Sequence, residues 1–110
     1  MLLLEAIATA ADARGGAPAI VLDGREMSYA ALDASVTRAA VALSGARVVP
    51  GTPVGLIVDD IPLHIVVLLA LFRLGAPVLP LASADPPALR RSLIARAGVR
   101  AVVGAAARAA

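Results

Sequence analysis

Apolar positions at the start of the chain recur at the spacing of one helical face. They fall at i, i+3, i+4 and i+7, and they are Leu4, Ile7, Ala8 and Ala11. This spacing predicts an amphipathic helix, which Gly15-Gly16 would stop. Residues 17–22 then form an apolar extended run, and Asp23-Gly24 after it is a strong signal for a tight turn. The chain is therefore expected to open with a helix and a small hairpin.

A second helical pattern follows Ser28, which is a favourable N-cap residue. Its apolar side is expected to hold Leu32, Val36, Ala39, Ala40 and Leu43. Gly45 should end this helix, because Pro50 and Pro53 prevent the segment that follows from being helical. Residues 54–58 are apolar at consecutive positions, which predicts a strand covered on both faces in the centre of a parallel sheet.

Helix and strand signals alternate through the remainder of the chain. Asp60 is predicted to cap a helix that has Pro62 in its first turn and ends near Gly75. Residues 77–81 predict a short strand, and residues 99–103 predict the last one. From residue 54 the order is β-α-β-α-β, for which right-handed crossovers and a parallel sheet are the default.

Between those last two strands, Asp85 is predicted to cap a helix that begins at Pro86-Pro87 and closes at Gly98. Its apolar face is expected to turn inward with Leu89, Leu93, Ile94 and Ala97, and its outward face to carry Arg90, Arg91 and Arg96. The alanine-rich tail from Ala105 is typical of the start of a further helix. The expected fold class is α/β: a β-α-β-α-β parallel-sheet unit preceded by an amphipathic helix and a small hairpin.

The composition fits one small domain with little polar surface. At 110 residues, a compact unit buries roughly two-thirds of the surface that its unfolded chain exposes. Since 60% of the residues are hydrophobic and 16% are charged, some apolar surface is expected to need a partner. Residues 1–110 are therefore interpreted as a single partial domain with no second domain.

Charge and targeting signals narrow the function classes. The net charge is +2, the arginines are scattered and there is one Tyr and one Phe, so nucleic-acid binding gains little support. Residues 61–72 form the strongest candidate for a membrane segment, but they fall short of the roughly 20 residues that span a bilayer. With no basic segment before the short apolar run at the N-terminus, a cytoplasmic protein is expected. The absence of cysteine is compatible with a reducing compartment.

Two acidic residues and one histidine are the first candidates for a site. His64 is the only histidine and has Asp60 at i−4 as its only helical carboxylate neighbour, so a packed or half-buried structural residue is expected rather than a metal ligand or acid-base group. Asp59-Asp60 could hold a magnesium ion, but adjacent carboxylates before a helix more often serve its free amides. Capping is the favoured interpretation.

The remaining candidates also favour structural roles. Gly51 and Gly55 fit turn and packing positions, since neither phosphate-loop pattern surrounds them. Arg90 and Arg91 could contact an acidic partner or a phosphate, but the outward face of a helix is an ordinary place for solvated charge. No plausible base accompanies the serines, which are Ser28, Ser35, Ser44, Ser83 and Ser92. No catalytic, cofactor-binding or metal residue is assigned from the sequence.

Three segments, in this order and spacing, resemble the opening of adenylate-forming enzymes, the superfamily of acyl-CoA synthetases and peptide-synthetase adenylation domains. Residues 17–21 (Ala-Pro-Ala-Ile-Val) and 27–32 (Met-Ser-Tyr-Ala-Ala-Leu) resemble its first core motif, with Ala31 at the usual Glu. Residues 49–56 are similar to its Pro-Gly-Asp stretch, with Thr52 at the Asp. Residues 71–81 resemble its second core motif, after which Ala82 departs from the acidic or amide residue.

The resemblance implies the N-terminal subdomain of an enzyme that activates a carboxylate with MgATP and passes the acyl group to CoA or to a phosphopantetheine carrier. It implies no catalytic residue here, because the phosphate loop and the family's lysines follow this region and the chain contains no lysine. The expected function is a scaffold fragment of such a ligase, which is not expected to be catalytic alone and whose partner is the remainder of an adenylating enzyme. The alternative is a freestanding interaction module that dimerises or docks on a partner subunit through exposed apolar surface.

Overall fold

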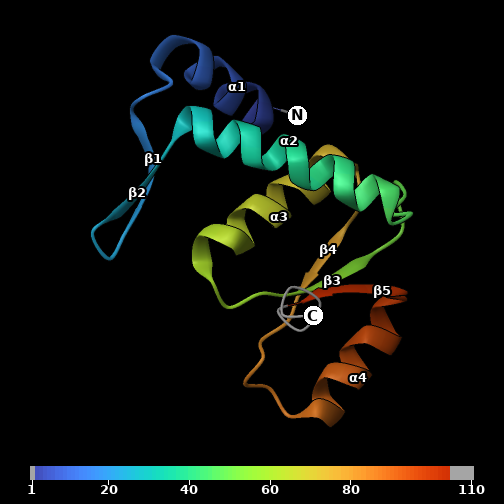
Figure 1. Cartoon of the computed structure of the whole chain (residues 1–110). Helices are drawn as coiled ribbons and strands as arrows, with labels where there is room; N and C mark the ends of the chain where they lie inside the picture. The colour runs from blue at the N-terminus through green and yellow to red at the C-terminus, as the bar shows by residue number, and fades with distance from the viewer. Residues whose placement is uncertain (1, 105–110) are drawn as a thin grey trace.

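The computed structural model describes residues 2–104 and shows four helices and five strands there. In chain order they are α1 (Leu2–Arg14), β1 (Pro18–Leu22), β2 (Arg25–Ser28), α2 (Tyr29–Gly45), β3 (Val54–Ile57), α3 (Ile61–Arg73), β4 (Val78–Pro80), α4 (Pro87–Ala97) and β5 (Ala101–Gly104). Figure 1 shows the layers: α1 lies on α2, α2 lies on α3, and α3 covers one face of the sheet while α4 lies beyond the other. The helix expected from Ala105 lies outside the described residues.

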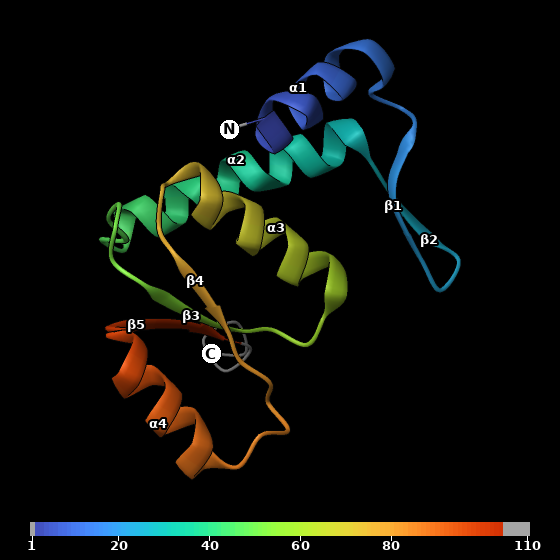
Figure 2. The same ribbon diagram turned by 180° about the vertical axis from the view of Figure 1, so that it is seen from behind.

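The N-terminal helix and hairpin form as the sequence predicts. β1 and β2 pair antiparallel, and the turn between them places Asp23 at φ 51° and Gly24 at φ 75°. Positive φ at both central residues suits the right-handed twist of a hairpin, which explains the Asp-Gly pair. The hairpin projects from the helical layer in both views (Figure 2).

Side-chain caps begin the two central helices. The Ser28 hydroxyl accepts a hydrogen bond from the amide of Ala31 at 3.1 Å, and the Asp60 carboxylate accepts one from the amide of Leu63 at 3.0 Å. Each bond satisfies an amide that the first turn of a helix leaves free. Both predicted caps are confirmed.

The three parallel strands lie in the order β4-β3-β5. Val54 of β3 is opposite Val78 on one side and Ala101 on the other, so β3 is the central strand that its apolar run predicts. Because the chain moves from β3 to β4 and then back past β3 to β5, the two crossover helices lie on opposite faces of the sheet. The predicted parallel sheet is confirmed.

Two hydrophobic clusters meet at α3. One joins α3 to α1 and α2, and its buried residues are Ile7, Leu32, Val36, Ala40, Val66, Leu69 and Ala70. The other joins α3 to the sheet, and its buried residues are Val54, Leu56, Val58, Val67, Leu71 and Ala76. α3 therefore packs on two sides, and an ion pair from Arg73 to Asp33 at 3.7 Å also links it to α2.

Three helices end in the same hydrogen-bonded motif, but only two of them have glycine in its left-handed position. After α3, the amide of Ala76 donates to the carbonyl of Leu71, and Gly75 has φ 73°. After α4, Gly98 takes that position with φ 71°. These are Schellman ends, in which a left-handed residue lets two amides return to the last helical turn.

At the end of α2 the left-handed residue is Arg47, with φ 68°. Its amide donates to the carbonyl of Ser44 and that of Val48 donates to Leu43, which is the same pair of bonds. Gly45 is the last helical residue, as predicted, but the reversal occurs two residues later. A side chain in this conformation costs about 1–2 kcal/mol.

The inward packing predicted for α4 is wrong for Leu89 and Ala97 and holds only in part for Leu93 and Ile94. None of its residues is buried: Leu89 is 45% exposed, Ala97 is exposed, and Leu93 and Ile94 are only half-buried. Its periodicity selects the side on which Leu93 and Ile94 lie, but that side is only partly buried. The cap predicted at Asp85 is also wrong, because the helix begins one residue later than expected and its N-cap is Pro86, which makes no side-chain bond.

Candidate functional site

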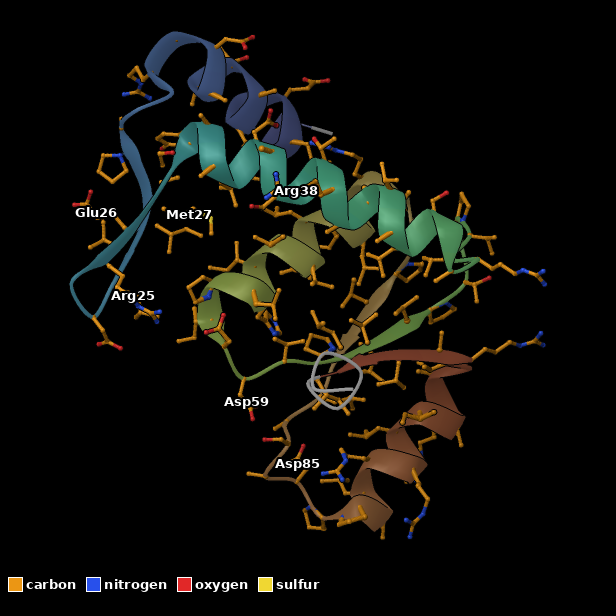
Figure 3. The ribbon with its side chains drawn as sticks, in the orientation of Figure 1. Arg25, Glu26, Met27, Arg38, Asp59 and Asp85 are labelled. Carbon is orange, nitrogen blue, oxygen red and sulfur yellow. The ribbon has the colours of Figure 1, made fainter. Side chains whose placement is uncertain are left out.

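The carboxyl ends of β3 and β4 form the natural place to look for a site. The connections that leave these neighbouring strands cross to opposite faces, and in open parallel sheets ligands bind in the crevice at such a point. The loop of residues 58–60 follows β3, and the loop of residues 81–86 follows β4. Figure 3 shows Asp59 and Asp85 in these loops, between the starts of α3 and α4.

Asp59 and Asp60 have separate partners. Asp60 caps α3, whereas the Asp59 carboxylate accepts a hydrogen bond from the Ser83 hydroxyl at 2.7 Å. Among residues 2–104, no three His, Cys, Asp or Glu side chains lie close enough together to hold a metal ion. The geometry therefore supports capping for Asp60 and a loop-to-loop contact for Asp59.

Arg90 corrects the expectation of a solvated, outward side chain. One of its guanidinium nitrogens donates to the carbonyl of Ser83 at 3.0 Å and to that of Asp85 at 2.6 Å. It therefore binds back onto the loop before α4, because that loop leaves carbonyls without helical partners. Arg91 beside it is exposed, as expected.

His64 is half-buried, as predicted, in the first turns of α3. Its Nδ1 atom lies 3.2 Å from the carbonyl oxygen of Val58. A carbonyl can only accept, so Nδ1 carries the proton in this contact. The ring thus holds the end of β3 against α3, and its role is to join two elements.

The glycines and serines also occupy structural positions. Gly51 has φ 81° in the turn before β3. Gly55 lies where an added Cβ would be 3.2 Å from a methyl of Val102 and 3.3 Å from one of Leu81, so it permits close packing. Ser28 caps α2, and Ser35 accepts a hydrogen bond from Arg38 at 3.2 Å.

The contact between Ser83 and Asp59 is not foreseen in the sequence interpretation. The two residues are 24 positions apart, and each lies just after a strand. The contact could have been predicted from their positions after neighbouring parallel strands, since the carboxyl ends of such strands meet at one edge.

Two surface pockets lie elsewhere on the described part of the chain. One, of about 180 Å³, lies between the hairpin and the start of α3, and its lining is Ile20, Leu22, Arg25, Glu26, Met27 and Pro62. Figure 3 shows Arg25, Glu26 and Met27 on the hairpin. The other, of about 310 Å³, lies at the amino ends of β3 and β5, and its lining is Arg47, Val48, Val49, Thr52, Val54, Arg100 and Ala101. Sequence spacing gives no sign of either pocket, because each combines segments joined only by the fold.

The sequence profile of AMP-binding enzymes matches residues 7–110, and the chain belongs to this family. The nonribosomal peptide synthetase sidE of Aspergillus fumigatus is 44% identical over 70 residues, which are 64% of this chain and 3% of that protein. The resemblance found in the three sequence motifs is thereby confirmed.

The fold is that of the N-terminal subdomain of adenylate-forming enzymes. The N-terminal subdomain of Klebsiella oxytoca NpsA, in complex with 3-hydroxyanthranilyl-AMSN, superposes with a TM-score of 0.85 at 20% identity. The match covers 93% of this chain and 26% of that one. O-succinylbenzoate coenzyme A synthetase of Bacillus subtilis, in complex with AMP, gives 0.81 at 17% identity, over 89% of this chain and 26% of that one. The chain thus spans about a quarter of these solved structures.

Proposed function

We propose that residues 1–110 form a partial domain that serves as scaffold for an ATP-dependent ligase, which activates a carboxylate as an acyl- or aminoacyl-adenylate. The carrying observation is the superposition on 93% of this chain with a TM-score of 0.85, over 26% of the NpsA subdomain. The caps at Ser28 and Asp60 and the central strand β3 set the geometry on which the rest of such a fold would be built.

In the proposed reaction a carboxylate oxygen of the acid attacks the α-phosphorus of MgATP and pyrophosphate leaves. The acyl group then passes to the thiol of CoA or of a phosphopantetheine carrier, and AMP leaves. The chain contains no lysine, the residue type with which the family contacts the phosphates and the carboxylate. No step is therefore assigned to a residue of this chain, and the groups that contact the nucleotide belong to other parts of the ligase.

The partner that fits the exposed apolar surface best is the remainder of the adenylate-forming fold. Leu89 of α4 is 45% exposed and Val102 of β5 is 43% exposed, so the α4 side of the sheet is only partly covered. The charged residues of α4 are all arginines, Arg90, Arg91 and Arg96. Two copies meeting through α4 would oppose like charges, which disfavours the self-association that a freestanding module would use.

Among residues 2–104, no helix is long and apolar enough to cross a membrane. We propose a cytoplasmic location, because the substrates of the reaction are the water-soluble nucleotide and thiol carriers of that compartment.

Isothermal titration of the purified, folded chain with MgATP and with a nonhydrolysable acyl-adenylate analogue tests the scaffold role. The NpsA subdomain, titrated with 3-hydroxyanthranilyl-AMSN, is the positive control. We expect no saturable heat from this chain under conditions in which the control saturates. Micromolar binding by this chain would show that it holds a nucleotide site of its own and would overturn the scaffold proposal.

Sedimentation equilibrium distinguishes the proposed partner from the alternative. A scaffold that lacks its partner should bind a hydrophobic dye through the α4 surface and show no defined dimer. A dimer that Leu89→Arg dissociates would support the interaction module instead.

A further inference from the structure

We propose that the pocket at the amino ends of β3 and β5 binds a small carboxylate that carries an apolar body. This basic pocket is lined by Arg47, Val48, Val49, Thr52, Val54, Arg100 and Ala101, and its volume is about 310 Å³. It lies at the edge of the sheet opposite the loops after β3 and β4, so the proposal is independent of the scaffold role.

The fold brings together two arginines that are distant in sequence. Arg47 follows α2, and Arg100 precedes β5, whose first residue, Ala101, pairs in register with Val54. The end of α2 and the start of β5 lie on the same side of the molecule in both ribbon views. The strand register places Arg100 beside the start of β3, and the end of α2 brings Arg47 to the same pocket.

Neither guanidinium is used by the rest of the described chain. Arg47 and Arg100 form no side-chain hydrogen bond or ion pair with residues 2–104, and the pocket lining contains no carboxylate. Arg90 shows the contrast, because its guanidinium does bind free carbonyls. Two unneutralised cations beside one concave surface create a positive potential that favours an anion.

Hydrogen bonding of its side chain to the end of α2 does not account for Arg47. The carbonyls of Leu43 and Ser44 at the end of α2 already accept amide hydrogen bonds, from Val48 and Arg47 respectively. Arg47 also adopts φ 68°, where the equivalent positions after α3 and α4 are Gly75 and Gly98. A side chain retained in a strained position beside a pocket points to a use for that side chain.

The rest of the lining selects the class of anion. Val49 is 49% exposed, and with Val48 and Ala101 it gives the pocket an apolar wall, while Thr52 is a polar residue of the lining. A guanidinium binds a carboxylate through two parallel hydrogen bonds. An amphipathic monoanion uses both features, whereas a bare inorganic anion uses only the charge.

Two-dimensional NMR of the labelled chain, titrated with hexanoate at constant ionic strength, tests the proposal. We expect saturable shifts confined to amides at residues 47–54 and 100–103, with a dissociation constant on the order of 1 mM. The neutral hexanamide and inorganic phosphate should each bind about 10-fold more weakly. Equal binding of hexanamide would overturn the role of the arginines, and equal binding of phosphate would overturn the role of the apolar wall.

Matched variants locate the site. Arg47→Gly, which relieves the backbone, and Arg100→Gln should each weaken hexanoate binding by about 10-fold or more, because each removes a charged donor. Arg91→Gln removes an exposed arginine that lines neither pocket, and it should leave binding unchanged. Unsaturable shifts, or equal binding by all three variants, would overturn the proposal.

Discussion

α3 and α4 are both crossover helices of one parallel sheet, yet their environments differ. α3 has five buried residues and lies between the sheet and the α1–α2 layer, whereas α4 has none. Both have apolar residues at helical spacing. Periodicity decides which face of a helix turns inward, while the number of sides on which the helix is packed decides how far its residues are buried.

The largest expected difference in stability between α3 and α4 is given by a matched pair of leucine truncations. Leu71 of α3 is 0% exposed, so Leu71→Ala should lower the free energy of unfolding by about 2–5 kcal/mol through lost burial and a cavity. Leu89→Ala in α4 should cost less than about 1 kcal/mol, because Leu89 is 45% exposed. Urea denaturation followed by circular dichroism measures both, and equal losses would contradict the difference in packing.

A smaller change in stability is expected from a substitution at Gly55, on the face of the sheet toward α4. An added Cβ at Gly55 would meet side chains of Val102 and Leu81 at 3.2 and 3.3 Å, so Gly55→Ala should cost about 1–3 kcal/mol by overpacking. Gly45→Ala is the control, because that position has open space and lies in α2, where alanine is favoured by about 0.5–1 kcal/mol. A neutral Gly55→Ala variant in the same urea series would mean that this face is looser than its contacts indicate.

The loop before α4 is held by polar contacts rather than by burial. Arg90→Gln should lower stability by about 1–2 kcal/mol, because Arg90 donates to the carbonyls of Ser83 and Asp85. Amide exchange should accelerate at residues 81–90 more than in α3. Arg91→Gln is the matched control with an expected change near zero. Unaltered exchange around α4 in Arg90→Gln would show that these bonds do not anchor the loop.

The sequence predicts most of the fold because its signals are local. Caps at Ser28 and Asp60, the Asp23-Gly24 turn and Gly75 each act within one turn of backbone, and all of them are confirmed. The motif resemblance likewise gives the family, which the profile match shows.

The errors concern the side-chain contacts and the start of α4, and the omissions concern features that depend on neighbours distant in sequence. Leu89 is 45% exposed, and Arg90 donates to carbonyls of its own loop. Asp85 precedes the N-cap by one residue, which a shift of one residue in the helix start explains. The contact of Ser83 with Asp59 and the basic pocket arise only when parallel strands are placed side by side.

The smallest expected change in stability concerns a feature that α3 and α4 share, the left-handed glycine at the end of each helix. Gly75 and Gly98 have φ of 73° and 71° in equivalent positions after the two helices, and a Cβ would meet no neighbour closer than 3.6 Å at either. Gly75→Ala and Gly98→Ala should therefore each cost about 1 kcal/mol, since the penalty is local to the backbone and independent of burial.

At position 47, after α2, the left-handed residue is an arginine, so a substitution by glycine is expected to relieve backbone strain. Arg47→Gly should be about 1 kcal/mol more stable than Arg47→Ala, because both lack the charge and only glycine relieves φ 68°. Thermal and urea denaturation of the four variants give the comparison. If Gly98→Ala cost nothing while Gly75→Ala cost about 1 kcal/mol, the end of α4 would be open in solution, and the difference between the two helices would extend from side-chain burial to the backbone itself.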